Sequence, residues 1–411
     1  MLAHKESQKG KGYRKEIIEF NLKQEEYIMW LLEKLKTKTY KHGGYTEFYV
    51  TEPKVRKIEK SRYIDRIVHR WIVDNFLEPA YVPQFIKTTY ACIKNRGMHK
   101  ACVDTQKTMK HCKAKWGEYY ILKMDVSKYF DNIDKQILLK ILKRKIQDKD
   151  IIWLLEEIIY AQKRPKGLEI GNYTSQMFAN IYLNEVDQYI KHKLKIKYYK
   201  RYLDDSIIFV KTKKEAKETL EKIQKYLKEN LGLELNKKTQ IFKSKQGVNF
   251  CGYKINEYRL KIRDKGKRKL KKKVKKLTKQ VKEGKITSKE AKKYLAGHMG
   301  YIQIANIYNL TNKLFYTEWI FEIKNWIFIW QKLGINRKLP TAIILVPTGE
   351  AITTIPALTI QLLTAITMGL PMPTTILVSA QHSNTIFRLY ILRNIYSKGI
   401  SIKEIYSFRN Y

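Results

Sequence analysis

The sequence predicts an α+β fold with a separate apolar C-terminal extension. Residues 119–124 and 198–210 are rich in β-branched and aromatic residues, which are typical of strands. Residues 213–230 carry apolar residues at helical spacing, as in an amphipathic helix. Residues 351–387 contain no charged residue and many Thr, Ile, Leu and Pro. The chain therefore combines strands and helices, and its C-terminal part differs in character from the rest.

The composition limits the class of protein. A chain of 411 residues suggests two or three domains, at roughly 150 residues each. The 82 Lys and Arg residues against 39 Asp and Glu give a net charge of +43. Such an excess points to a polyanionic partner, most simply nucleic acid, with a membrane surface as the alternative. The N-terminus lacks the apolar segment of a signal peptide, so we expect a cytoplasmic protein.

The four cysteines form no Cys-x-x-Cys pair. Reduced thiols in a cytoplasmic protein are the simplest interpretation. A metal site among Cys92, Cys102 and Cys112 is a minor alternative, because two histidines lie among these residues.

The N-terminal third predicts helices around one basic hairpin. A helix is expected over 16–35, followed by strands at 46–50 and 54–58. Basic residues on such a finger-like hairpin could meet a nucleotide triphosphate, although a solvated charged hairpin is the alternative. Ser61 is a candidate N-cap for a helix over 61–79. The basic loop around Arg96, before a helix over 99–113, suits contact with a phosphate backbone.

Two adjacent carboxylates, Asp204 and Asp205, lie between two apolar runs. The pattern predicts a hairpin that holds both aspartates at its tip. Their mutual repulsion is tolerable if a divalent cation binds there, and Mg²⁺ prefers such oxygen ligands. A solvated acidic turn is the alternative.

A third carboxylate, Asp125, closes the predicted strand 119–124. A strand-end aspartate beside an Asp-Asp hairpin is the set needed to hold two metal ions ~3.5–4 Å apart. Such ions can activate an attacking 3′-hydroxyl and stabilise a pyrophosphate leaving group. Phe130 follows Asp125 at the fifth position, where an aromatic ring could close the sugar pocket and exclude a 2′-hydroxyl.

Gly171 precedes a predicted helix and allows close backbone approach. Thr174 or Ser175 is the expected cap of this helix, which could press a nucleotide or template base against the acidic hairpin. One or two further helices are expected over 135–161.

Residues 259–285 hold fifteen Lys or Arg against two acids. Leu270, Val274, Leu277 and Val281 recur there at helical spacing, so the segment predicts a basic amphipathic helix along a phosphate backbone. Its candidate nucleic-acid contacts are Lys267, Arg268, Lys271, Lys272 and Lys275.

The apolar tail poses the question of a membrane span. Its longest proline-free apolar run is 357–370, which is 14 residues long, whereas a helical span needs ~20. We expect a β-rich packing or partner-binding appendage and no membrane insertion.

Five motifs occur in the order found in reverse transcriptases, and the resemblance covers roughly residues 50–312. The chain is most similar to the reverse transcriptases of diversity-generating retroelements. Ile170-Gly171 and Ser175-Gln176 stand where group II intron and retroviral enzymes usually have Gln-Gly and Ser-Pro. The motifs are Asp125-Val-Ser-Lys-Tyr-Phe130, Ile170-Gly-Asn-Tyr-Thr-Ser-Gln176, Tyr202-Leu-Asp-Asp205, Leu235-Asn-Lys-Lys-Thr239 and Phe250-Cys-Gly-Tyr253.

This resemblance implies a right-hand polymerase fold and a set of site residues. Fingers would span 1–115, the palm 116–258 and a helical thumb 259–335, with 336–411 as an extension of unknown role. The implied metal site, for two Mg²⁺ ions or Mn²⁺ in their place, is Asp125, Val126, Asp204 and Asp205. The implied nucleotide contacts are Lys54, Arg56, the steric gate Phe130, Ile170, Gly171 and Gln176, and Lys238 would be the acid for pyrophosphate.

The resemblance also implies a function. Family members copy a template RNA into cDNA from dNTPs, with frequent errors at adenines, and the cDNA replaces a variable region of a target gene. They bind the RNA–cDNA hybrid and usually act with a small basic accessory protein. An antiviral reverse transcriptase with untemplated or protein-primed synthesis is one alternative, and a catalytically idle nucleic-acid-binding protein is another.

Overall fold

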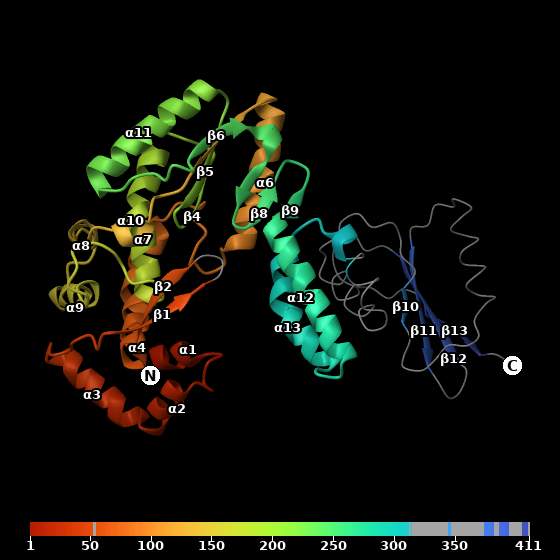
Figure 1. The fold of residues 1–411 in the computed structure, drawn as a ribbon, viewed down its shortest axis with the longest axis horizontal. Helices are drawn as coiled ribbons and strands as arrows, with labels where there is room; N and C mark the ends of the chain where they lie inside the picture. The colour runs from red at the N-terminus through yellow and green to blue at the C-terminus, as the bar shows by residue number, and fades with distance from the viewer. Residues whose placement is uncertain are drawn as a thin grey trace. The chain divides into compact units, whose positions relative to one another are not determined.

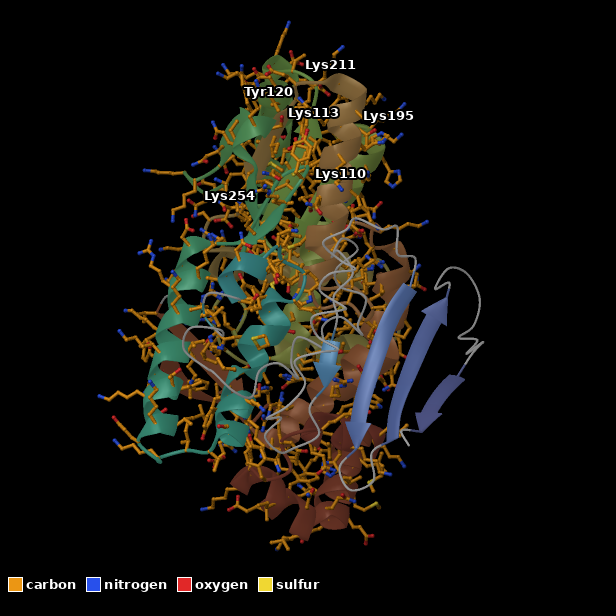
Figure 2. All side chains as sticks on the ribbon, turned by 90° about the vertical axis from the view of Figure 1, so that its right-hand side faces the viewer. Lys110, Lys113, Tyr120, Lys195, Lys211 and Lys254 are labelled. Carbon is orange, nitrogen blue, oxygen red and sulfur yellow. The ribbon has the colours of Figure 1, made fainter. Side chains whose placement is uncertain are left out.

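A computed structural model describes residues 1–51, 55–311 and 314, and the backbone of four strands between 344 and 409. The chain divides into two compact units, Met1–Glu322 and Ile323–Tyr411 (Figure 1). Basic side chains project from many elements of the first unit (Figure 2). The candidate site residues all belong to this unit.

A four-stranded antiparallel sheet in the strand order β4-β5-β3-β6 forms the middle of the first unit. β4 and β5 form the predicted hairpin, in which Tyr202 pairs with Asp205. Strand β3 lies between β5 and β6, which places the end of β3 beside the hairpin tip. The strands are β3 (Tyr120–Met124), β4 (Tyr199–Tyr202), β5 (Asp205–Val210) and β6 (Gln240–Lys243).

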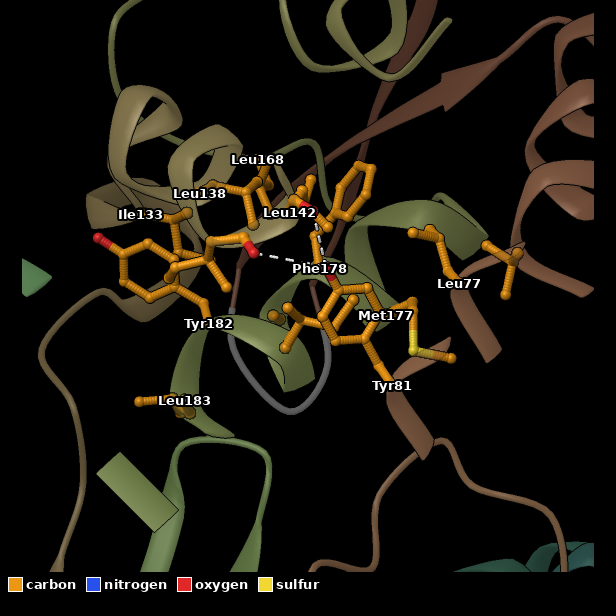
Figure 3. Close-up of a cluster of buried hydrophobic side chains, with 14 of the residues drawn as sticks. Leu77, Tyr81, Ile133, Leu138, Leu142, Leu168, Met177, Phe178, Tyr182 and Leu183 are labelled. Carbon is orange, nitrogen blue, oxygen red and sulfur yellow. Dashed lines mark hydrogen bonds between the residues drawn. The ribbon is translucent and has the colours of Figure 1, made fainter. Parts of the chain in front are cut away.

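Helices cover both faces of this sheet. Successive residues of β4 point to opposite faces, and Arg201 meets Asp187 of α10, whereas Lys200 meets Tyr90, in the segment just before α6. Helix α10 is the most deeply buried, and Phe178 lies at the centre of its apolar contacts (Figure 3). The covering helices are α6 (Met98–Trp116), α10 (Tyr173–Gln188) and α11 (Lys213–Leu231). Helix α8 (Lys135–Lys143) packs against α10, and α9 (Lys149–Ile159) packs against α8.

The fingers contain the predicted hairpin, formed by β1 (Tyr45–Val50) and β2 (Arg56–Ser61). The single helix expected over 16–35 is wrong. Two helices occur there because Lys23, at φ −125° and ψ 35°, leaves the helical conformation between them. The helices of this region are α1 (Leu2–Gln8), α2 (Lys15–Leu22), α3 (Gln24–Lys36), α4 (Tyr63–Ile72), the π-helix Val73–Leu77, α5 (Glu78–Tyr81) and the 3₁₀ turn Val82–Gln84.

Two predicted helix caps are wrong for one physical reason. Helix α4 follows Arg62, because the Ser61 hydroxyl donates to Asn172 Oδ1 at 2.6 Å and is not used as a cap. Helix α10 follows Asn172, and Thr174 and Ser175 are buried inside it. Ser61 and Thr174 each contact a residue far away in the sequence, Asn172 and His69, which a local pattern does not reveal.

The thumb follows a small sheet of three antiparallel strands, β7 (Val248–Phe250), β8 (Tyr253–Ile255) and β9 (Leu260–Ile262). The basic helix α12 (Asp264–Lys282) buries Leu270, Val274 and Leu277, as its spacing predicts. Helix α13 (Ser288–Ile302) packs against it and begins with a capping box between Thr287 and Glu290. Fingers, palm and thumb together form the right-hand polymerase fold. The remaining short elements are α7 (Tyr129–Asn132), the π-helix Tyr189–Lys193 and the 3₁₀ turn Ser244–Gln246.

The second unit contains a four-stranded sheet in the order β10-β11-β12-β13. Strand β10 is parallel to β11, and the other pairs are antiparallel. The apolar run 357–370 lies outside the described residues. Among the helices that the structure describes, none is both long and apolar enough to cross a membrane. The strands are β10 (Ile344–Val346), β11 (Thr374–Gln381), β12 (Ile386–Arg393) and β13 (Ile405–Arg409).

Candidate active site

The tip of the acidic hairpin has a strained backbone conformation, which a hydrogen bond from β4 supports. Leu203 and Asp204 connect β4 to β5, and Leu203 has φ 52°, a left-handed conformation that is unfavourable for a branched apolar residue. Arg201 Nη1 donates a hydrogen bond to the Leu203 carbonyl oxygen at 3.2 Å. This contact supports the backbone immediately before Asp204.

Arg201 is itself fixed by a buried polar network. Its exposed side-chain fraction is 2%, and its guanidinium binds both oxygens of the fully buried Asp187, with Nη2 2.6 Å from Oδ2. Asp187 also accepts hydrogen bonds from the hydroxyls of Tyr199 at 2.7 Å and Thr89 at 2.8 Å. Arg201 Nη1 lies 3.1 Å from Asn180 Oδ1. The hairpin is therefore tied to α10 and to the loop before α6.

Sequence reasoning did not identify Arg201 or Asp187 as site residues. One signal was present: Asp187 ends a helix whose buried face is otherwise apolar or uncharged, so it needs a cationic partner. The sequence did not reveal which of the many basic residues is that partner.

Asp125 lies directly after β3, and its backbone carbonyl accepts a hydrogen bond from Asn236 N at 2.7 Å. Val126 forms an isolated bridge with Leu235, and its side chain is buried. The Lys238 amide donates to Asn236 Oδ1 at 3.1 Å, and the Lys238 side chain is exposed. The turn that carries Lys238 is thus attached to the Asp125 segment, as both predicted roles require.

The three carboxylates influence one another. Burial, followed by the negative charge of Asp125, raises the pKa of Asp204. Burial also raises the pKa of Asp205 to about 6, although the Lys123 ammonium opposes this rise. Lys123 Nζ lies 3.0 Å from Asp205 Oδ1 and 3.1 Å from Oδ2, and it also donates to the Asn249 carbonyl at 2.5 Å. Lys123 therefore partly neutralises Asp205 and connects it to β7.

The donor chemistry of this cluster fits Mg²⁺. Carboxylate oxygens are its preferred protein ligands, and the buried Asp205 Oδ1 accepts no well-aligned hydrogen bond, although Lys123 Nζ lies 3.0 Å away. A cation would stabilise the ionised forms that burial and mutual repulsion now disfavour. Within the described ranges, no three His, Cys, Asp or Glu side chains are already arranged as a metal-binding group. The alternative cysteine site gains no support from the described residues, because Cys102 and Cys112 are buried free thiols, whereas Cys92 is an exposed one.

The fingers hairpin faces the same cluster. Burial and Asp125 raise the pKa of Asp204, and the positive charge of Arg56, on β2, opposes this rise. Arg56 is exposed and could also meet a triphosphate, which remains a prediction. Lys54, the other predicted triphosphate contact, lies outside the described residues.

The loop before α10 is bound to β2. Glu59 N donates to the Ile170 carbonyl at 3.1 Å, and Asn172 Oδ1 accepts from Ser61 N at 3.2 Å. Gly171 has φ 125°, and a Cβ there would lie 3.0 Å from Ile58 Cγ2. Glycine is thus needed for both its backbone angle and its closeness to β2.

Phe130 belongs to the same neighbourhood. Leu168 N donates to the Phe130 carbonyl at 2.8 Å, so the loop that carries Ile170 is attached to the segment after Asp125. Gln176 lies in the first turn of α10 and is half-buried. The fold therefore brings the predicted gate and the predicted base-pair lining onto one set of connected segments, although their roles stay predictions.

The predicted nucleic-acid contacts lie on other elements. Arg96 Nη1 donates to the carbonyls of Ile86 at 2.8 Å and Thr89 at 2.7 Å, so part of its guanidinium stabilises the loop before α6. Lys267 forms an ion pair with Asp264 at 3.2 Å. The others, Arg268, Lys271, Lys272 and Lys275, are exposed on α12. Binding of nucleic acid by these residues remains a prediction.

The raised pKa of Asp205 predicts how stability depends on pH in metal-free protein. An acid whose folded-state pKa is raised stabilises the fold below its ordinary value, and that contribution is lost as the pH rises through about 6. Asp205→Asn removes this loss. We therefore expect it to raise the free energy of unfolding by about 1–3 kcal/mol at pH 8, and by much less near pH 4.

Melting temperatures measured against pH in the presence of a chelator test this prediction. Asp264→Asn is the control, because Lys267 lowers the pKa of this exposed carboxyl, and no gain is expected from its removal. A stabilisation by Asp205→Asn that does not change between pH 4 and pH 8 would contradict the prediction.

Known proteins resemble this chain in part. It is 26% identical over 305 residues to the group II intron-encoded protein LtrA of Lactococcus lactis. This match covers 56% of this chain and 50% of LtrA. It is 26% identical over 232 residues to protein YkfC of Escherichia coli, which covers 46% of this chain and 60% of YkfC. The chain spans 31% to 60% of the length of the first curated relatives it matches.

Solved telomerase structures show a weaker likeness. Telomerase from Candida albicans superposes with a TM-score of 0.44 at 11% identity, over 75% of this chain and 61% of that chain. Apo telomerase from Candida tropicalis gives a TM-score of 0.40 at 13% identity, over 54% of this chain and 49% of that chain.

The family assignment comes from a family model that covers β2, Asp125 and the β4–β5 hairpin. The model described as "Reverse transcriptase (RNA-dependent DNA polymerase)" matches residues 50–255, half of the chain. This range includes all three carboxylates and the loop before α10. The chain belongs to the reverse transcriptase (RNA-dependent DNA polymerase) family.

Proposed function

We propose that this protein is an RNA-directed DNA polymerase that copies a template RNA into cDNA from dNTPs. One observation carries the proposal: the β4–β5 hairpin sets Asp204 and Asp205 beside Asp125, which follows the adjacent strand β3, and burial together with the charge of Asp125 raises the pKa of Asp204. A protein that only binds nucleic acid has no reason to gather carboxylates on a basic chain, because they repel phosphate.

The residues divide the work of nucleotidyl transfer. Asp125, Asp204 and Asp205 would hold two Mg²⁺ ions, with the Val126 carbonyl beside them. Bound Mg²⁺ supplies activation of the primer 3′-hydroxyl and charge stabilisation of the pyrophosphate leaving group. Arg56 binds the triphosphate through its fork of N–H donors. Lys238 donates a proton to pyrophosphate, and Phe130 excludes a 2′-hydroxyl from the sugar pocket.

Primer extension on a defined RNA template, with Mg²⁺ and four dNTPs, tests the proposal. We expect cDNA complementary to the template, and no product after removal of Mg²⁺ with a chelator. Products that do not follow the template sequence would contradict RNA-directed synthesis. A small basic accessory protein and a structured RNA are proposed partners, so an absence of product must be checked again in their presence.

A narrower proposal concerns the purpose of synthesis. The apolar Ile170 beside Gly171 fits loosened base selection, as in adenine-directed mutagenic retrohoming by diversity-generating retroelements. The Ile170 carbonyl is bound to Glu59 N, so the residue sits on a fixed loop, and a change of its side chain should alter the pocket and not the loop path.

Ile170→Gln is expected to lower misincorporation opposite template adenines, because a polar side chain at this position restores a hydrogen-bonding wall to the base pair. The measurement is sequencing of cDNA that wild-type and variant enzymes make on one template. Ile170→Leu, which keeps an apolar side chain, is the control and should keep the wild-type error pattern. Adenine errors that are unchanged in Ile170→Gln would count against the narrower proposal and leave the polymerase intact.

A further inference from the structure

We propose that a basic face of the palm, far from the carboxylates, binds the phosphate backbone of RNA outside the template–primer duplex. The inference rests on the proposed function, since it assigns a second contact for the template RNA. We call this surface the α6 face. It consists of exposed or half-buried lysines on the C-terminal half of α6, on the loop before β4 and after β5, namely Lys107, Lys110, Lys113, Lys115, Lys193, Lys195, Lys197 and Lys211.

The lysines of the α6 face are not neutralised by the protein. None of them forms an ion pair with any residue that the structure describes. The only acid of α6, Asp104, instead accepts a hydrogen bond from the Tyr90 hydroxyl at 3.1 Å. Elsewhere on the palm, Lys243 and Lys245 lie 3.8 and 2.7 Å from Glu118. Like charges left together destabilise the fold, so a bound polyanion would stabilise this face.

The loop of the α6 face is fixed. The Lys191 ammonium donates to the carbonyls of Ile196 at 3.0 Å and Lys197 at 2.8 Å, and burial lowers its pKa. Lys195 takes φ 54°, which turns the chain sharply. This interior lysine holds the loop so that Lys193, Lys195 and Lys197 stay exposed. A fixed loop loses less conformational entropy on binding than a flexible one.

Ring contacts join the loop to the helix. The Tyr198 ring lies 5.5 Å from the His111 ring and 5.3 Å from the Trp116 ring, measured between centroids. In Figure 2, Lys110 and Lys113 on α6 gather in the same part of the palm as Lys195 and Lys211. The loop therefore lies against the C-terminal half of α6, and Lys110, Lys113, Lys195 and Lys211 lie in one part of the palm.

Topology separates the α6 face from the site of synthesis. Its loop precedes β4, whereas Asp204 follows the other end of β4, so a strand of roughly 13 Å lies between them. Likewise, α6 leads into the start of β3, and Asp125 follows the end of β3. A phosphate bound to the α6 face therefore belongs neither to the incoming nucleotide nor to the nascent base pair.

The chemistry favours RNA over an acidic protein. Lys107, Lys110 and Lys113 recur every three residues along about 9 Å of helix, which suits a row of phosphates. The centres of protein–protein interfaces are depleted in lysine and enriched in large apolar side chains. None of the large hydrophobic side chains that the structure shows as exposed lies on the α6 face.

The test compares two substrates and two matched triple variants of the full chain. Lys110→Ala/Lys113→Ala/Lys195→Ala removes charge from the α6 face. Lys15→Ala/Lys23→Ala/Lys225→Ala removes the same charge from exposed lysines that pair with nearby glutamates. One substrate is a short RNA–DNA template–primer duplex, and the other is the same duplex with long single-stranded RNA arms at both ends.

We expect the α6-face variant to bind the armed substrate roughly tenfold more weakly, with a slope of log affinity against log salt that is shallower by about 2. Its binding and extension of the short duplex should match wild type, and the control variant should match wild type on both substrates. Unchanged binding of the armed substrate would overturn the proposal in favour of an acidic protein partner. Equal losses of affinity for both substrates would overturn it, because the α6 face would then bind the template–primer duplex itself. Absence of DNA synthesis by the wild type and by both triple variants would instead overturn the proposed polymerase function. The affinities for the two substrates could still be compared in that case.

Discussion

Replacement of Asp204 by alanine is expected to lower primer extension by roughly a thousandfold or more, while binding of the template–primer duplex is kept. Asp204 follows the strained Leu203 at the hairpin tip, and burial and the charge of Asp125 raise its pKa, so we propose that it holds a cation and does not stabilise the fold. Single-turnover extension and filter binding on the same substrate measure the two properties separately.

Glu221→Ala is the matched control, because Glu221 is an exposed carboxylate on the outer side of α11 in the same domain. It should leave extension unchanged. If Asp204→Ala lost duplex binding together with extension, or lowered the melting temperature sharply, the carboxylates would have a structural role and the two-metal interpretation would be weakened.

Replacement of Arg201 by methionine is expected to lower the free energy of unfolding by about 3–5 kcal/mol, because Asp187 would remain buried without its cationic partner. Arg201 and Asp187 are exposed by only 2% and 0% in their side chains, so water cannot replace the lost ion pair. The midpoint of urea unfolding of the full chain measures the loss.

Arg144→Met provides the comparison. Arg144 lies 2.7 Å from Glu185, with 56% of its side chain exposed, and a surface pair of this kind contributes about 1 kcal/mol or less. Similar small losses for Arg201→Met and Arg144→Met would contradict the role assigned to the buried network.

Arg201→Lys separates support of the hairpin from stability. Lysine keeps a positive charge near Asp187 but cannot donate at once to Asp187, Asn180 and the Leu203 carbonyl, as the guanidinium does. A variant that recovers much of the stability yet extends primers slowly would identify Arg201 as a positioning residue for Asp204. Full recovery of both would restrict its role to stability.

Local pattern was sufficient for much of the fold. Apolar runs on both sides of Asp204 and Asp205 predicted the hairpin, and helical spacing predicted α11 and α12, because one buried face imposes a period on each of these helices. The same logic failed where polar groups have distant partners. Ser61 and Asn172 lie 111 residues apart and form a hydrogen bond with each other, so Ser61 is not the expected cap of α4. Asn172, and not Thr174 or Ser175, precedes α10.

The sequence by itself determined the chemistry of this protein: three carboxylates in two motifs, an excess of basic residues and the order of its elements. Only the tertiary structure decided which contacts position the carboxylates and which basic residues neutralise their charge. Arg201 pairs with Asp187, and Lys123 pairs with Asp205. The loop that carries Ile170 is hydrogen-bonded to β2. All three contacts join segments that are distant along the chain. Such pairs depend on strand order and on which face of a strand is buried. In a chain with 82 basic residues, no local pattern shows that Arg201 and Lys123 are the partners of Asp187 and Asp205.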